Sequence, residues 1–192
     1  MSHPAGRVQA KPVELRYSPI MRILALLGSP RMVLIVLTAV SALYMCLVAL
    51  GNISDYGTNR AFVEHVLAMD TTFGSANTKW RAVTDQRLVT AAYLTIIIWE
   101  SLIALVLTVA FLGWLRGIVS RCGSLVAAQL SICGWLMQVL LFGGGFIGVG
   151  GEWFEMWQSA KWNGTQAAFQ NLLIPAVGLM LAHLLAREWQ HE

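Results

Sequence analysis

Charged residues are scarce in this chain and make up only 12% of its 192 residues. Ordinary soluble domains carry about 25% charged residues, whereas 57% of this chain is hydrophobic and its mean hydropathy is +0.63. The balance excludes an ordinary soluble protein and predicts one membrane domain over residues 1–192. The net charge of +3 does not indicate a nucleic-acid partner, because in a membrane protein it reflects Lys and Arg on the cytoplasmic side.

Cysteine is also rare, and the chain has only Cys46, Cys122 and Cys133. Three cysteines without regular spacing give neither a disulfide framework nor a metal site. Cys46 and Cys133 fall in apolar runs, where cysteine acts as a small apolar residue. Cys122 falls at the predicted inner face, where palmitoylation is the alternative. The chain has no recognisable catalytic constellation either, so we expect no catalytic residue, no bound metal and no cofactor.

Long apolar runs are what the chain has in abundance. Four of them approach or exceed the roughly 20 residues that a spanning helix needs, over 32–50, 88–115, 125–149 and 167–186. Strands of a membrane barrel would be shorter and would alternate. Ser29 and Pro30 suit the N-cap and the first position of the first spanning helix. The preceding run, Ile20 to Leu27, is too short to span, so residues 1–28 are predicted to be a cytoplasmic segment with an interfacial helix rather than a cleaved signal peptide.

Basic residues flank these runs unevenly. On one side lie Arg7, Lys11, Arg16, Arg22, Arg31, Arg116, Arg121 and Arg187, and on the other lie Arg60, Lys79, Arg81, Arg87 and Lys161. Because basic residues close to the membrane favour the cytoplasm, both termini are predicted to be cytoplasmic. The loops 51–87 and 150–166 are then exported. The predicted fold is an all-α, four-transmembrane-helix bundle.

Glu100 lies near the middle of the second apolar run. A charged residue at that depth costs roughly 2.5–3.5 kcal/mol, so an intramembrane acid indicates a function or a specific contact. Counted from the outer face, Gln138 lies at nearly the same depth. We expect Glu100 to lie within hydrogen-bond reach of Gln138, Tyr44 or an ordered water. Gln129 and His183 form a second polar level. Such pairs either hold helices in register or carry a proton or ligand, and we favour the first interpretation.

The first exported loop is rich in polar residues, and part of it is predicted to form a short helix that lies on the outer end of the bundle. Its residues up to Asn59 are typical of turns, whereas apolar residues from Phe62 to Met69 recur at helical spacing. The candidate residues of this loop are Asn52, Asp55, Tyr56, Asn59, His65 and Asp70. Two carboxyl groups and one imidazole are a weak metal pattern, so capping and hydrogen bonding within the loop are the preferred interpretation.

The second exported loop supplies Trp153, Phe154, Trp157 and Trp162. Aromatic residues gather at membrane interfaces, and they are also frequent in contacts with proteins. We expect the two loops to fold together as a cap, with Phe62 and Val66 shielded from water. Just before this loop, Gly144 and Gly148 have the spacing that lets two helices approach closely. The alternative is that the glycines form an irregular end of the third span that shapes a cavity.

Several segments of these loops carry a resemblance to a known family. They are Asn52 to Asn59, Phe62-Val63, His65 to Leu67, Met69 to Phe73, Trp99-Glu100, Trp153-Phe154, Met156 to Ser159 and Trp162 to Gly164. Over residues 31–187 the chain resembles the bacterial predicted small integral membrane proteins, domain of unknown function 2165. The resemblance implies four spans and a bacterial inner membrane, and it implies no activity, cofactor or catalytic residue.

Three hypotheses of function follow. The first is a non-catalytic accessory subunit of a larger bacterial membrane complex, such as an energy-transducing one, with the lipid bilayer and other subunits as its partners. The second is a small transporter, channel or sensor that uses Glu100 as its proton or cation group. An enzyme built on the exported acids and His65 ranks third.

Overall fold

The computed structural model describes residues 18–120 and 124–189, and within them all regular structure is helical. The elements are α1 (Pro19–Leu27), α2 (Pro30–Ser54), α3 (Tyr56–Ala68), the short 3₁₀ helix η1 (Lys79–Arg81), α4 (Gln86–Ser120), α5 (Ser124–Val139), the π-helix η2 (Leu140–Trp153), the 3₁₀ helix η3 (Met156–Gln158) and α6 (Thr165–Trp189). Cys122 and residues 1–17 of the predicted cytoplasmic segment lie outside the described residues.

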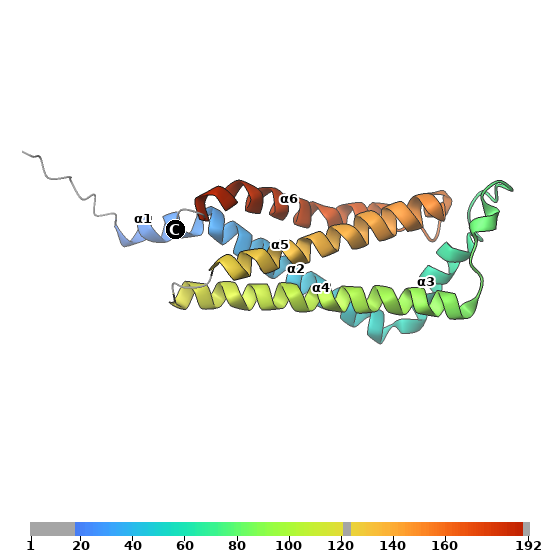
Figure 1. The fold of residues 1–192 in the computed structure, drawn as a ribbon, viewed down its shortest axis with the longest axis horizontal. Helices are drawn as coiled ribbons and strands as arrows, with labels where there is room; N and C mark the ends of the chain where they lie inside the picture. Colours follow the sequence, from blue (N-terminus) through green and yellow to red (C-terminus); the bar gives the residue numbers. More distant parts are fainter. Residues whose placement is uncertain (1–17, 121–123, 190–192) are drawn as a thin grey trace, which may run out of the picture.

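Four helical segments among the described residues are long and apolar enough to cross a membrane, which confirms the predicted all-α membrane bundle. They are Pro30–Ser54, Gln86–Ile118, Leu125–Trp153 and Thr165–Leu184. They run antiparallel in sequence order, so α1 and the end of α6 lie at the same end of the bundle (Figure 1). We name this the termini end and the opposite one the cap end. Helix α1 begins after Ser18 and extends beyond the bundle, and its binding to a membrane surface stays a prediction.

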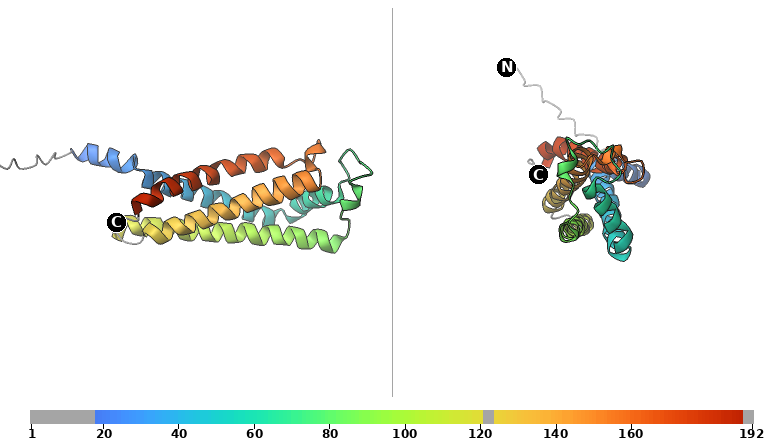
Figure 2. Two further views of the ribbon diagram at one scale, coloured as in Figure 1. Left: turned by 45° about the horizontal axis from the view of Figure 1, so that its top comes forward. Right: turned by 90° about the vertical axis from the view of Figure 1, so that its right-hand side faces the viewer.

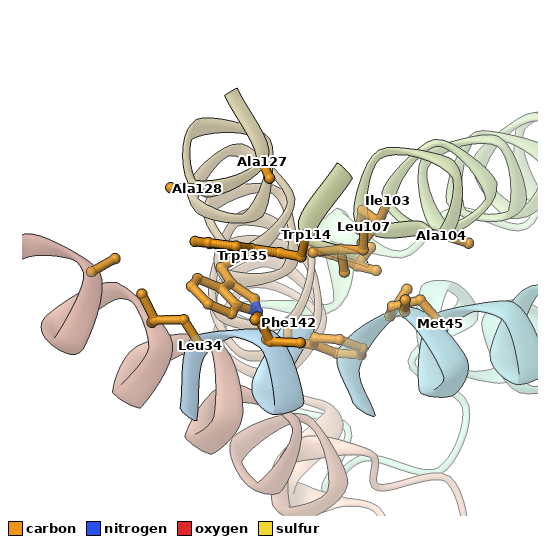
Figure 3. Close-up of a cluster of buried hydrophobic side chains, with 14 of the residues drawn as sticks. Leu34, Met45, Ile103, Ala104, Leu107, Trp114, Ala127, Ala128, Trp135 and Phe142 are labelled. Atoms are coloured by element: carbon orange, nitrogen blue, oxygen red, sulfur yellow. The ribbon is translucent and has the colours of Figure 1, made fainter. Parts of the chain in front are cut away.

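The core toward the termini end is packed around two tryptophans. Trp114 and Trp135 are fully buried, together with Leu34, Met45 and Leu107 (Figure 3). Their indole N–H groups donate to hydroxyls from other helices: Trp114 Nε1 to Ser131 Oγ at 3.0 Å, and Trp135 Nε1 to Ser41 Oγ at 3.1 Å. A buried indole needs such a partner, so these bonds fix how α2, α4 and α5 face one another.

Close helix packing uses glycines other than the predicted pair. A Cβ atom on Gly134 would collide with Leu107, and one on Gly178 would lie 2.9 Å from ring atoms of Trp135. Gly144 and Gly148 are exposed, with nothing from a neighbouring helix beside them in the described residues. Their spacing therefore does not join two helices of this bundle, because the π-helical turn points them outward.

The two loops fold together at the cap end, as predicted, and we call residues 55–86 and 154–164 the cap. Phe73 N donates to Gln158 Oε1 at 2.8 Å, and Thr71 Oγ1 lies 2.8 Å from Ser159 Oγ. Ring contacts join the same segments, with Phe73 edge-on to Trp157. On the other side, Arg60 of α3 hydrogen-bonds Thr90 of α4. Specific bonds thus join the two parts of the cap to each other and connect α3 to α4.

The predicted cap aromatics and apolar residues lie at different depths. Phe154 is buried and Trp162 is half-buried, whereas Trp153 and Trp157 are exposed. Phe62 and Val66, both predicted to be shielded, are half-buried. Arg81 lies over the Trp153 ring at 4.7 Å and donates to the Trp153 carbonyl. Arg81 of the cap therefore holds the Trp153 ring, at the end of η2, in place while this ring still presents an exposed surface.

Candidate functional site

Glu100 is 2% exposed, and its partner is Asn52. Asn52 Nδ2 donates to Glu100 Oε2 at 2.6 Å, and Tyr93 Oη donates to the Asn52 backbone carbonyl at 2.8 Å. The contact arises because α2 continues as a helix to Ser54, so that Asn52 occupies its last turn and faces α4. Asn52 was expected in a turn of the first loop; the helix instead carries it to the carboxyl group.

The Glu100 carboxyl group lines a cavity of about 360 Å³. Polar residues from α2, α4, α6 and the cap converge on it: Tyr44, Asn52, Glu100, Asn163 and Asn171. The remaining walls are small or apolar: Val48, Phe62, Phe142, Phe146, Gly164, Ala167 and Ala168. A mostly apolar cavity with a few convergent polar groups is the usual form of a small-ligand site. We therefore treat this cavity as the candidate site.

The cavity lies where α2 and α6 separate. The two helices are close at the termini end and diverge toward the cap (Figures 1 and 2). Helix α6 contains Pro175, which has no backbone N–H, so the carbonyl of Asn171, four residues earlier, lacks its usual helical donor. Asn171 itself lines the cavity, one turn before this interruption of the helix.

Gln138 lies at the predicted depth but does not pair with Glu100 in the structure. It is 2% exposed, and its Oε1 atom has no hydrogen-bond donor among the described residues. The neighbouring Met137 carbonyl accepts from Trp99 Nε1 at 3.1 Å. Equal depth on two helices does not specify how each helix is rotated about its axis. This rotation decides which side chains meet.

The second predicted polar level is not a pair either. Gln129 and His183 are both exposed, and the structure has no hydrogen bond between these two described residues. His183 borders a shallow groove whose other walls are Ile132, Leu136, Leu179, Met180 and Leu184. Similar depth on adjacent helices again did not bring the side chains together.

His65 and Asp70 meet in the cap. His65 Nδ1 lies 2.6 Å from Asp70 Oδ2, and the imidazole stacks on Trp162 with ring centroids 4.5 Å apart. Asp55 is not part of this cluster, because it lies at the junction of α2 and α3. Asn59 bonds to backbone carbonyls at that junction, and Tyr56 packs edge-on against Tyr93. These contacts order the loop, as its sequence suggested.

The cavity is closed toward the termini end. Below Glu100 the interior is filled by Met45, Ile103, Ala104 and Leu107, each less than a tenth exposed, and then by the two buried tryptophans. Sequence reasoning did not identify Asn171, Asn163 or the sealing tryptophans as parts of one site. The polar character of Asn171 inside the fourth span was the available signal.

Comparison with known proteins identifies the family. Residues 30–185 match the family model described as predicted small integral membrane protein, DUF2165. The chain belongs to this family. No curated protein and no solved structure matches the chain. Membership agrees with the four spanning segments and establishes that the DUF2165 protein is an integral membrane protein, with the lipid bilayer around it.

Proposed function

We propose that this DUF2165 protein is a membrane sensor that holds a cation or a small hydrogen-bond donor at Glu100, entering from the cap side. The observation that carries the proposal is the buried Glu100 carboxyl group on the wall of a cavity of about 360 Å³. Carboxyl groups inside a membrane usually mark ligand or ion sites because of their cost. The polar residues around it supply oxygen acceptors suited to a cation or a donor.

The closed core favours a sensor over a channel. A channel needs an open polar path on both sides of the site, whereas the interior below Glu100 is filled by side chains. Its buried hydroxyls bond to one another, to a backbone carbonyl or to the indoles of Trp114 and Trp135. Ligand binding between α2 and α6 would change how far these helices separate. Such a change is the kind of signal that a one-sided site can transmit.

The test uses purified protein and simple probes that carry the proposed chemistry. Butylamine, butanol and alkali cations are added, and thermal unfolding is followed for wild type, Glu100→Gln and Glu100→Leu. At least one probe should raise the melting temperature of wild type, and Glu100→Leu should lose this response while remaining folded. Absence of any response in wild type, or an unchanged response in Glu100→Leu, rejects the proposal.

Access to the cavity is tested by cysteine labelling in a cysteine-free background. A water-soluble thiol reagent should modify Asn171→Cys from the cap side and should leave Ala42→Cys, whose native residue is 5% exposed, unmodified from either side. Labelling of Asn171→Cys from both sides would favour a channel.

Orientation belongs to the same proposal. We propose a bacterial inner membrane with both termini cytoplasmic and the cap exported. The basic residues near the termini end support the orientation, and the bacterial membrane is what the resemblance of the loop residues implies. In intact cells, a membrane-impermeant reagent should modify Ser75→Cys and not Ser2→Cys. Modification of Ser2→Cys reverses the orientation.

A second candidate is the accessory subunit of a larger membrane complex. The observation in its favour is the exposed surface at Gly144 and Gly148, where a neighbouring helix could approach the backbone. Native purification from the source membrane should then recover other subunits, and Gly144→Leu should release them without lowering the melting temperature. A monomer that purifies alone and responds to ligand would leave the sensor as the better account.

A further inference from the structure

A second cavity, of about 320 Å³, lies next to the polar one. It is lined mainly by α3, α4 and the π-helix η2, and its walls include Val63, Val66, Leu67, Ile96, Leu141 and Val149. Thr95 is the one polar side chain among its lining residues, and it bonds to its own helix through the Ala91 carbonyl. This compartment is therefore suited to hydrocarbon.

The two cavities have two walls in common. Phe62 and Phe146 line both of them. The Phe62 ring packs edge-on to Trp162 and reaches over Gly164, where a Cβ atom would lie 3.0 Å from the ring. Glycine at 164 leaves room for this ring. The polar and the apolar cavity therefore adjoin at these two aromatic side chains.

The π-helix places these walls. Phe142 faces the polar cavity, Leu141 and Val149 face the apolar one, and Phe146 contributes to both. A π-helix is wider than an α-helix and is frequent at functional sites, usually as a single turn. Here it runs for 14 residues, so one segment forms a wall of both compartments.

The charged residues around the two cavities indicate which kind of ligand headgroup would bind there. Glu100 is the acidic residue of the polar cavity, and neither cavity is lined by Lys, Arg or His. An anionic phosphate or carboxylate head would find no cation there and would face a carboxyl group. A hydroxyl or amine head would donate to the Glu100 carboxyl group or to the side-chain amide oxygen of Asn171.

We propose that the two cavities form one site for a single-chain amphiphile with a hydroxyl or amine headgroup, the head at Glu100 and the chain between α3, α4 and η2. The inference rests on the proposed function, because it names the ligand of the same Glu100 site. The head must provide the selectivity. An apolar chain gains little by leaving lipid tails that are equally apolar, so the bonds to Glu100 and Asn171 hold the ligand.

The test is photo-labelling in nanodiscs with a long-chain alcohol that carries a diazirine on its chain. Adducts should form on residues of α3, α4 and η2 that line the apolar cavity, and excess unlabelled alcohol or long-chain amine should compete. The matching fatty acid probe should give about tenfold fewer adducts there, as expected when one favourable head contact is lost. Equal labelling by alcohol and acid, or adducts spread evenly over lipid-facing residues, overturns the inference.

Variants separate the two compartments. Val66→Trp fills the apolar cavity and should abolish labelling there, whereas Val109→Trp, at a position that is 46% exposed on the lipid-facing side of α4, should not. Glu100→Leu should reduce labelling through loss of the head contact. If butylamine stabilises wild type but no chain adducts form, the amphiphile is wrong and the proposed function stands. If labelling survives Glu100→Leu, the apolar cavity binds the chain without Glu100 and the inference is wrong, whereas the proposed function is rejected only by its own melting-temperature test.

Discussion

The two halves of this bundle are built on different principles. Toward the termini, the indole N–H groups of Trp114 and Trp135 donate to hydroxyls, and side chains fill the interior. Toward the cap, α2 and α6 diverge, an acid lies beside a cavity, and Gln138 Oε1 has no donor among the described residues. The first half is thus closely packed, whereas the second half contains the cavity in which we propose that a ligand binds.

The largest expected effect comes from the filled half. Trp135→Ala removes a fully buried side chain and should lower the free energy of unfolding by about 3–5 kcal/mol. The matched control is Trp80→Ala, since Trp80 is 71% exposed in the cap, and it should cost about 0.5–1.5 kcal/mol through its ring contacts. Denaturation in mixed micelles measures both. Equal losses would mean that the two halves do not differ in stability.

Substitutions at two glycines, one in each half, should give the next largest difference in stability. Gly178→Ala places a methyl group against the Trp135 ring and should destabilise the protein by about 1–3 kcal/mol, as overpacking does. Gly144→Ala enters open space and should leave the melting temperature unchanged or slightly raised. The same unfolding measurement compares them. A larger loss for Gly144→Ala would show that its exposed surface packs against a partner in the purified sample.

The pair in the cap half should contribute less. Asn52→Ala removes the donor to Glu100 Oε2, and hydrogen bonds between membrane helices contribute about 0.6–1.7 kcal/mol. Combining it with Glu100→Leu should give less than the sum of the two single losses, because the residues are in contact. Additive losses in this double-mutant cycle would show that the bond does not form in solution.

The smallest expected effect concerns the hydrogen bond that joins the two parts of the cap at Phe73 and Gln158. Gln158→Ala leaves the Phe73 amide without its acceptor and should cost about 0.5–1.5 kcal/mol. Hydrogen exchange should become faster at Phe73, while amides of the filled half keep their rates. Gln166→Ala, an exposed change at the start of α6, is the control. Protection that is unchanged at Phe73 would mean that other cap contacts suffice.

Sequence reasoning worked best where composition decides the outcome. Four long apolar runs and few charges require spanning helices, since the backbone must satisfy its hydrogen bonds internally in lipid. The prediction of a cap also succeeded, because an apolar helical face beside an aromatic-rich loop has to be covered. The family resemblance, too, was visible in the loop residues and was confirmed.

Sequence reasoning was weakest for contacts between helices. The depths of Gln138 and Glu100 predict a bond between them, but Asn52 is the partner of Glu100. The spacing of Gly144 and Gly148 predicts close helix packing, but Gly134 and Gly178 are the glycines that lie against a neighbouring helix. Gln129 and His183 failed in the same way. Depth and spacing describe one helix at a time, and neither gives its rotation or tilt.

The sequence by itself determined the class of this protein, the number of its spans and the position of a costly acid within one of them, because these depend on hydrophobicity along the chain. Only the tertiary structure decided which residues meet that acid. The tilt of α2 against α6 opens the cavity, the extra turn of α2 delivers Asn52, and the π-helix turns Phe146 between two compartments. Each depends on how whole helices pack, which no local pattern of residues specifies.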